Sequence, residues 1–156
     1  MWLAAISSLS SIFVHLLLAA LFGAALGLER TLAGKHAGVR TYALVSLGSA
    51  LFVAISELVI ANYTSLGNPM ITLDPLRIPS QVVMGIGFLG TGLIIFRESK
   101  LSGLTTAAGL WVAAGIGVAA GFGLTLLAGF TTILTLLVFT LLWRFEQKIK
   151  PETNGD

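Results

Sequence analysis

The fold is decided by one stretch, residues 101–143, which reads LSGLTTAAGLWVAAGIGVAAGFGLTLLAGFTTILTLLVFTLLW. These 43 residues include no charged side chain. As one continuous helix they would extend about 65 Å, roughly two thicknesses of the hydrocarbon core of a bilayer. The stretch must therefore fold back on itself. Gly121-Phe122-Gly123 is the natural reversal, because glycine tolerates the positive φ of a tight connection between helices.

Three further stretches each have the length and composition of one membrane crossing. Residues 1–28 carry no Asp, Glu, Lys or Arg, residues 42–61 carry one charge, and residues 78–96 carry none. The whole chain is 56% hydrophobic and only 10% charged, whereas about a quarter of the residues in a soluble domain are charged. We predict an all-α integral membrane protein. Its five transmembrane helices are expected at 9–28, 42–61, 78–96, 104–120 and 124–143, in one membrane domain, 1–143, followed by a polar cytoplasmic tail, 144–156.

The basic residues predict how these helices are oriented, because cytoplasmic loops of membrane proteins accumulate Lys and Arg. With the N-terminus outside and the C-terminus inside, the outer segments hold only Arg77. The inner segments then hold eight basic residues: Arg30, Lys35, Arg40, Arg97, Lys100, Arg144, Lys148 and Lys150. The first apolar run lacks a basic segment before it and is longer than the core of a cleavable signal, so we expect it to be retained as a span.

Several function classes are disfavoured by what the sequence contains. It has no cysteine, which excludes disulfides and thiolate chemistry. Residues 85–90 match the dinucleotide pattern GxGxxG, but they fall inside an expected span without a preceding strand, so helix packing explains them better. Neither HExxH nor GxSxG occurs. We expect a protein that is not an enzyme, needs no cofactor and binds the lipid bilayer but no nucleic acid.

The 18 glycines are phased on the expected helices. Small residues let helices approach closely within a membrane. In the third span Gly85 and Gly92 share one face and Gly87 and Gly90 the opposite face, which predicts a glycine-rich central third helix with neighbours on both sides. The glycines also lie on more helix faces than the packing of five helices requires, which predicts a homo-oligomer. The glycines expected to pack helices together are Gly23, Gly27, Gly85, Gly87, Gly90, Gly92, Gly117 and Gly121. The fifth span, rich in Leu, Phe and Thr, is expected at the periphery.

Polar residues within the bilayer are costly and are therefore candidates for function. On the second span, one face must turn inward because it carries Tyr42, Ser46, Ser49, Ser56 and Glu57. The candidate polar or ion site at the outer end consists of Asp74, Arg77, Gln81 and Glu57. Asp74-Pro75 reads as a helix N-cap followed by a first-turn proline. The group is either an outward-facing cation or proton site, or an ion pair of a carboxylate with Arg77 that holds two helices together.

Two other polar features leave alternatives open. A cytoplasmic basic cluster is predicted from Arg30, Lys35, Arg40, Arg97 and Lys100. It fits contact with anionic lipid, or with a phosphate-bearing ligand or a partner. His15, midway along the first span, either bonds a neighbouring helix or relays protons. At the outer end the ion pair is favoured over a magnesium site, because magnesium prefers six oxygen ligands and few carboxylates are available there. Whether the protein binds a metal is left open.

Six motifs occur in order along the chain and resemble those of the MgtC/SapB family. They are GLER at 27–30, KHAGVRT at 35–41, LGSALF at 47–52, DPLRI at 74–78, QVVMGIGFLGTG at 81–92, and GLTTAA at 103–108 followed by Trp111. The resemblance covers roughly residues 12–140 and is far more specific than any single pattern. Two departures are expected to matter: the chain lacks the cytoplasmic C-terminal domain of the MgtC branch, and Pro79 stands near the start of the third span.

The resemblance implies a multi-pass protein of the bacterial inner membrane. Family members are linked to growth under magnesium limitation and, in some pathogens, to survival inside host cells. It implies a non-enzymatic regulator of magnesium or membrane-energy homeostasis that acts on other inner-membrane proteins. A small cation or solute transporter that uses Glu57, Asp74 and Gln81 is the alternative. Asp74 is the acidic residue that the resemblance marks first.

Overall fold

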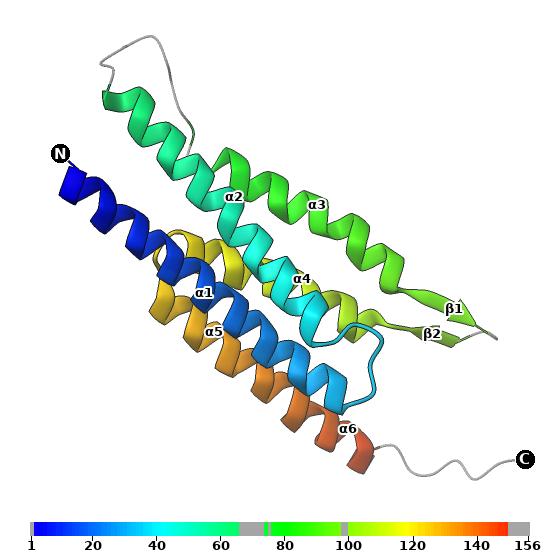
Figure 1. The fold of residues 1–156 in the computed structure, drawn as a ribbon. Coiled ribbons are helices and arrows are strands. Elements are labelled where there is room, and N and C mark those ends of the chain that lie inside the picture. Colours follow the sequence, from blue (N-terminus) through cyan, green and yellow to red (C-terminus); the bar gives the residue numbers. More distant parts are fainter. Residues whose placement is uncertain (1, 66–73, 75, 98–99, 150–156) are drawn as a thin grey trace, which may run out of the picture.

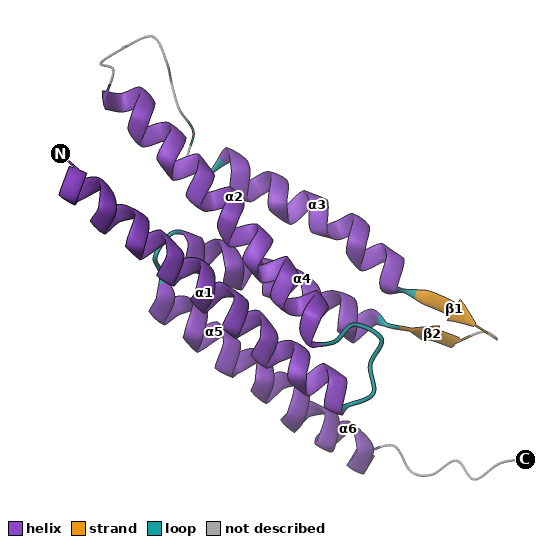
Figure 2. Cartoon of the chain, in the orientation of Figure 1, coloured by secondary structure: helices purple, strands orange, loops and turns teal. Residues whose placement is uncertain are grey.

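The computed structural model describes residues 2–65, 74, 76–97 and 100–149 as a bundle of helices with one short hairpin (Figure 1, Figure 2). In chain order the elements are α1 (Trp2–Leu32), α2 (Val39–Ser65), α3 (Arg77–Leu93), β1 (Ile95–Arg97), β2 (Lys100–Ser102), α4 (Leu104–Gly121), α5 (Thr125–Leu137), the π-helical turn η1 (Val138–Leu142) and α6 (Trp143–Ile149). The two strands pair antiparallel, with Ile95 opposite Ser102. The described residues are thus almost entirely helical, as the composition predicts.

Four helical segments are long and apolar enough to cross a membrane: Ser10–Leu32, Val39–Asn62, Leu104–Gly121 and Thr125–Ile149. The last of these runs through α5, η1 and α6, so the helix continues beyond the predicted end of the fifth span at residue 143. Helix α3 has 17 residues and extends only about 26 Å, against about 30 Å for the hydrocarbon core. It ends at Leu93 rather than at residue 96, because the chain there becomes the extended strand β1.

Two glycines end helices by the same capping motif. After α1, Gly34 adopts φ 66°, its N–H donates to the carbonyl of Thr31, and the N–H of Lys35 donates to that of Arg30. After α4, Gly123 adopts φ 73° and repeats this pattern. Glycine is favoured there because a side chain would strain the left-handed backbone. The reversal predicted at residues 121–123 is confirmed.

The central helix of the bundle is α4, which packs against α1, α2, α3 and α5. The prediction of a central third helix is wrong, because α3 packs mainly on α4 and, along a shorter contact, on α2. Its described side chains are largely exposed apart from Pro79 and Ile86. A Cβ added at Gly85, Gly87 or Gly92 would meet nothing within 4 Å. The spacing of the glycines predicted which faces of α3 carry small residues. It did not predict that α4 is the central helix.

The glycines of α1 and α4 lie where helices approach most closely. A Cβ at Gly23 of α1 would stand 2.5 Å from the Tyr42 carbonyl oxygen of α2. On α4, a Cβ at Gly117 would stand 2.8 Å from the Ser46 carbonyl carbon, and at Gly121 it would stand 2.9 Å from the Ala50 oxygen. Gly27 likewise lies against the backbone at the start of α2. Helices α1, α2 and α4 therefore pack backbone against backbone.

The bundle has two distinct ends. The α1–α2 connection, the β1–β2 hairpin and α6 lie at one end, whereas the N-terminus and the α4–α5 turn lie toward the other (Figure 1). The basic residues of the described chain, apart from Arg77, thus belong to segments at one end. Helix α5 lies on the outside of the bundle with Leu126 exposed. Its buried threonines, Thr132 and Thr135, donate to carbonyls of their own helix, which satisfies their hydroxyls within the apolar surroundings.

Candidate functional site

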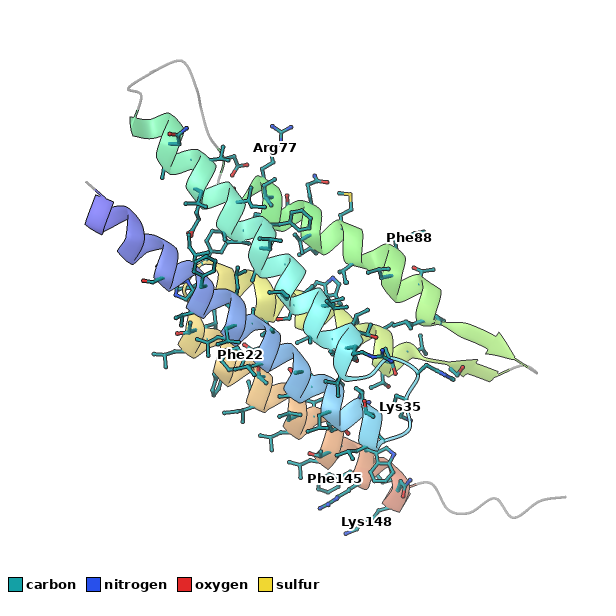
Figure 3. All side chains as sticks on the ribbon, viewed as in Figure 1. Phe22, Lys35, Arg77, Phe88, Phe145 and Lys148 are labelled. Carbon is teal, nitrogen blue, oxygen red and sulfur yellow. The ribbon has the colours of Figure 1, made fainter. Side chains whose placement is uncertain are left out.

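The residues predicted to form the outer polar site lie exposed at the start of α3 and in the C-terminal half of α2. Asp74 accepts a hydrogen bond on Oδ1 from the backbone N–H of Leu76, at 2.9 Å. Figure 3 shows Arg77 projecting away from the helices. Among the described residues, neither Asp74 nor Glu57 forms an ion pair with Arg77, and no group of three His, Asp or Glu could hold a metal ion. Gln81 is exposed as well, one helical turn after Arg77.

The start of α3 agrees in part with the prediction. The assigned helix begins at Arg77 and not at residue 75. The Asp74 carboxylate nevertheless accepts a hydrogen bond from the N–H of Leu76, two positions later, as an N-cap side chain does. Pro75 lies outside the described residues. Pro79 falls in the first turn of α3, where a backbone N–H has no partner within the helix, so the proline removes no helical hydrogen bond.

A buried cation lies at the opposite end of the bundle. Arg30 is only 4% exposed, forms an ion pair with Glu29, and places its guanidinium 3.7 Å from the centre of the Phe139 ring. The sequence placed Arg30 in a cytoplasmic basic cluster that is available to lipid, to a phosphate-bearing ligand or to a partner. For Arg30 this is corrected, because the side chain is buried against η1. Lys35 and Arg40 are exposed as expected. Arg97 and Lys100 lie opposite each other in the backbone register of the β1–β2 hairpin.

Helices α2 and α4 complete this buried cluster, hereafter the Arg30 cluster, which consists of Glu29, Arg30, Tyr42, Thr106, Gly109 and Phe139. Tyr42 is fully buried and donates from its hydroxyl to the Thr106 carbonyl at 2.9 Å. A Cβ at Gly109 would stand 2.7 Å from that hydroxyl and closer still to the Phe139 ring. Glycine is thus required where α1, α2, α4 and η1 meet.

Phe139 was missed by sequence reasoning, although a glycine at position 109 of the fourth span was a signal for a close neighbour. Phe139 lies in the π-helical turn, which rotates the residues after it relative to an α-helix. Simple helical phasing therefore could not assign its direction. The inward face predicted for α2 holds for Tyr42, Ser46 and Ser49, whereas Glu57 is exposed.

Ser46 and His15 lie at two further helix contacts. Ser46 is fully buried between Gly23 and Gly117, and its Oγ has no hydrogen-bond partner among the described residues. His15 packs on the α4–α5 turn, since a Cβ at Gly123 would stand 3.0 Å from its Cε1 atom. Both side chains therefore lie in packing contacts.

An open groove of about 570 Å³ lies between α2 and α3. Gly48 of α2 and Gly85 of α3 both line it, together with large apolar side chains from each helix. Its two polar lining residues are Ser49, which donates to the Val45 carbonyl of its own helix, and Gln81. No charged residue lines it. The groove is therefore suited to an apolar occupant and not to a hydrated ion.

Comparisons with known proteins agree on one family. The sequence model of the MgtC family matches residues 16–148. The Escherichia coli K12 protein named "Putative magnesium transporter YhiD" is 44% identical over 80% of this chain and 57% of its own length. SapB of Bacillus subtilis is 37% identical over 62% of this chain and 41% of its own length. MgtC of Brucella abortus is 40% identical over 56% of this chain and 33% of its own length. The chain spans about half the length of the first of these relatives, and no solved structure matches it.

Proposed function

This chain belongs to the MgtC family, and from that premise we propose that it is a non-enzymatic membrane module that supports magnesium or membrane-energy homeostasis by binding other proteins of the bacterial inner membrane. The name of the Escherichia coli relative, "Putative magnesium transporter YhiD", supports the link to magnesium. The regulatory role is supported by the packing of the bundle and by the exposed outer face of α3.

The proposed topology has five crossings, with the N-terminus outside and the C-terminus inside. It is supported by the basic segments gathered at one end of the bundle (Figure 1) and by the bias of cytoplasmic loops toward Lys and Arg. Helix α3 counts as a crossing in this proposal. At 17 residues it is short, and membranes accommodate a short apolar helix by thinning locally or by extending polar side chains from its ends.

The single observation that carries the proposal is the filled interior of the bundle. Helices α1, α2 and α4 touch through their backbones at Gly23, Gly117 and Gly121. The Arg30 cluster closes the inner end with a buried ion pair and two aromatic rings. A path for a hydrated cation along the bundle axis would require these backbones to separate. Binding to a partner requires no such change.

The outer face of α3 is the proposed contact surface. Met84 is 71% exposed and Phe88 83% exposed, and Figure 3 shows Phe88 projecting from the outer side of the helix. Open space at Gly87 and Gly92 would let a second membrane helix approach closely. The proposed occupant is a transmembrane helix of an inner-membrane partner protein. Self-association through a separate face is also expected from the glycine content.

A cation transporter is the second candidate, because the E. coli relative is named a putative magnesium transporter. It would use Glu57, Asp74 and Gln81 at the outer end. These side chains are exposed, and among the described residues no ion pair or metal-binding group of carboxylates brings them together. The two candidates therefore differ in which side chain the function needs.

One experiment with two measurements separates the candidates. The first is the growth in low magnesium of a strain that depends on this protein. The second is the flux of Mg²⁺ into liposomes that contain the purified chain. We expect Phe88→Ala to abolish the growth benefit, because it removes the exposed ring without opening the core, while Asp74→Ala leaves growth unchanged. Leu126→Ala on α5 is the matched control, since Leu126 is 90% exposed on another helix. Protein levels are compared by immunoblot.

Liposome flux should equal that of protein-free vesicles. Saturable Mg²⁺ entry that Asp74→Ala abolishes would reject the regulator and establish the transporter. Equal growth of the Phe88→Ala and Leu126→Ala strains would show that the outer face of α3 is not the contact surface.

A further inference from the structure

The α2–α3 groove has the chemistry of a lipid-chain site. Both of its walls are apolar over most of their length, and a side chain added at Gly48 or Gly85 would meet no atom within 4 Å. On α3 the lining runs from Ile78 to Leu89, a rise of about 17 Å along the helix. One leaflet of the hydrocarbon core is about 15 Å thick. The groove therefore matches one leaflet in length.

The lining of the groove favours a hydrocarbon chain as its occupant. The groove has about 570 Å³ of space, and nine of its eleven lining residues are glycine or apolar. Inserting a hydrocarbon chain needs no hydrogen-bond donors or acceptors from such walls.

The charges at the two ends of the groove differ. Arg40 is exposed and precedes the lining residue Leu44 by four positions on α2, so it lies on the same helical face just beyond the groove. Lys35 is exposed in the adjoining connection, and Arg97 and Lys100 follow α3 in the hairpin. At this end, Glu29 is already paired with Arg30, and Glu98 lies outside the described residues.

The opposite end of the groove carries less positive charge. Arg77 lies there in the first turn of α3, and the exposed carboxylates of Asp74 and Glu57 offset it. An anionic headgroup is therefore attracted to the Arg40 end. The cytoplasmic leaflet, where basic residues gather, is also the one that carries a negative surface potential.

We propose that the α2–α3 groove binds one acyl chain of an anionic phospholipid, with the headgroup phosphate held at Arg40. The chain lies along Leu44, Gly48 and Phe52 of α2 and faces Gly85 and Leu89 of α3. The bound lipid would fill the space between α3 and α2, which touch only along a short contact. This inference stands apart from the proposed function, because the lipid occupies the groove and not the outer face of α3.

The test is native mass spectrometry of the purified full chain, titrated with phosphatidylglycerol or with phosphatidylcholine of identical acyl chains. Wild type should retain phosphatidylglycerol preferentially. Gly85→Leu should weaken its binding at least tenfold, because the leucine fills the groove, and Gly48→Leu should do the same from the other wall. Arg40→Gln should weaken it about fivefold, the usual contribution of one cation near a charged membrane surface.

Two matched variants give the controls. Gly87→Leu adds the same side chain to the same helix in open space outside the groove, and Arg77→Gln removes the cation at the other end. Both should bind phosphatidylglycerol as wild type does. The proposal is overturned if both glycine-to-leucine variants of the groove bind as tightly as wild type, or if Gly87→Leu weakens binding as much as they do. Equal retention of phosphatidylcholine, or a loss with Arg77→Gln instead of Arg40→Gln, would overturn the assignment of the headgroup.

Discussion

Gly117→Ala is expected to lower the free energy of unfolding by about 3 kcal/mol, the upper end for overpacking a well-filled core. The added Cβ would stand 2.8 Å from the Ser46 carbonyl carbon and closer still to its oxygen. The obstacle is backbone, not the flexible end of a side chain, so α4 and α2 must separate to admit one methyl group. An SDS titration of the purified protein in mild detergent, followed by tryptophan fluorescence, measures the loss.

Gly115→Ala provides the control on the same helix. A Cβ at Gly115 would meet nothing within 4 Å, and alanine favours a helix by about 1 kcal/mol over glycine. This variant should be as stable as wild type or more so. If the two alanine variants lose stability equally, α2 and α4 do not make the backbone contact described above.

Glu29→Gln is expected to cost about 3 kcal/mol of unfolding free energy, because it leaves the Arg30 guanidinium buried without a counter-charge. Arg30 is 4% exposed, so water cannot replace the lost carboxylate. The Phe139 ring at 3.7 Å supplies only part of the compensation. The same SDS titration measures the effect, and Lys35→Gln, at an exposed position of the same end, should change stability by less than about 0.5 kcal/mol.

The double variant Glu29→Gln with Arg30→Met identifies the cause. Methionine removes the buried charge while keeping an apolar side chain against Phe139, so at least half of the lost stability should return. A double variant that is less stable than Glu29→Gln alone would mean that Arg30 stabilises the bundle without its ion pair. In that case the cation–π contact would be the dominant interaction.

Most of the helices could be predicted from the sequence because uncharged length is a strong signal in a membrane protein. The reversal at Gly123 followed from the 43-residue apolar run, and the structure confirms it. The end of α1 was placed too early, at residue 28, because hydropathy treats Glu29 and Arg30 as exposed charges. In the structure they lie within the helix, where pairing with each other allows Arg30 to be buried.

The arrangement of the helices could not be predicted as well. Glycine phasing identifies small faces but not their partners, so Gly85 and Gly92 suggested a central α3 although the close contacts lie at Gly23 and Gly117. The Arg30 cluster depends on Phe139, whose direction is set by a π-helical turn that the sequence pattern does not reveal. The outer polar residues were recognised as neighbours along the chain. Their exposure could only be seen in the structure.

Cysteine labelling from the two sides of the membrane tests whether the five longest helices cross in turn, with the basic segments inside. The chain has no cysteine, so single replacements at Lys35, Asp74, Lys100 and Lys148 can be labelled with an impermeant maleimide on intact cells and after permeabilisation. We expect labelling of Asp74→Cys on intact cells and of the three lysine replacements only after permeabilisation. Labelling of Asp74→Cys and Lys100→Cys from the same side would mean that α3 does not cross, and would refute the topology of five crossings.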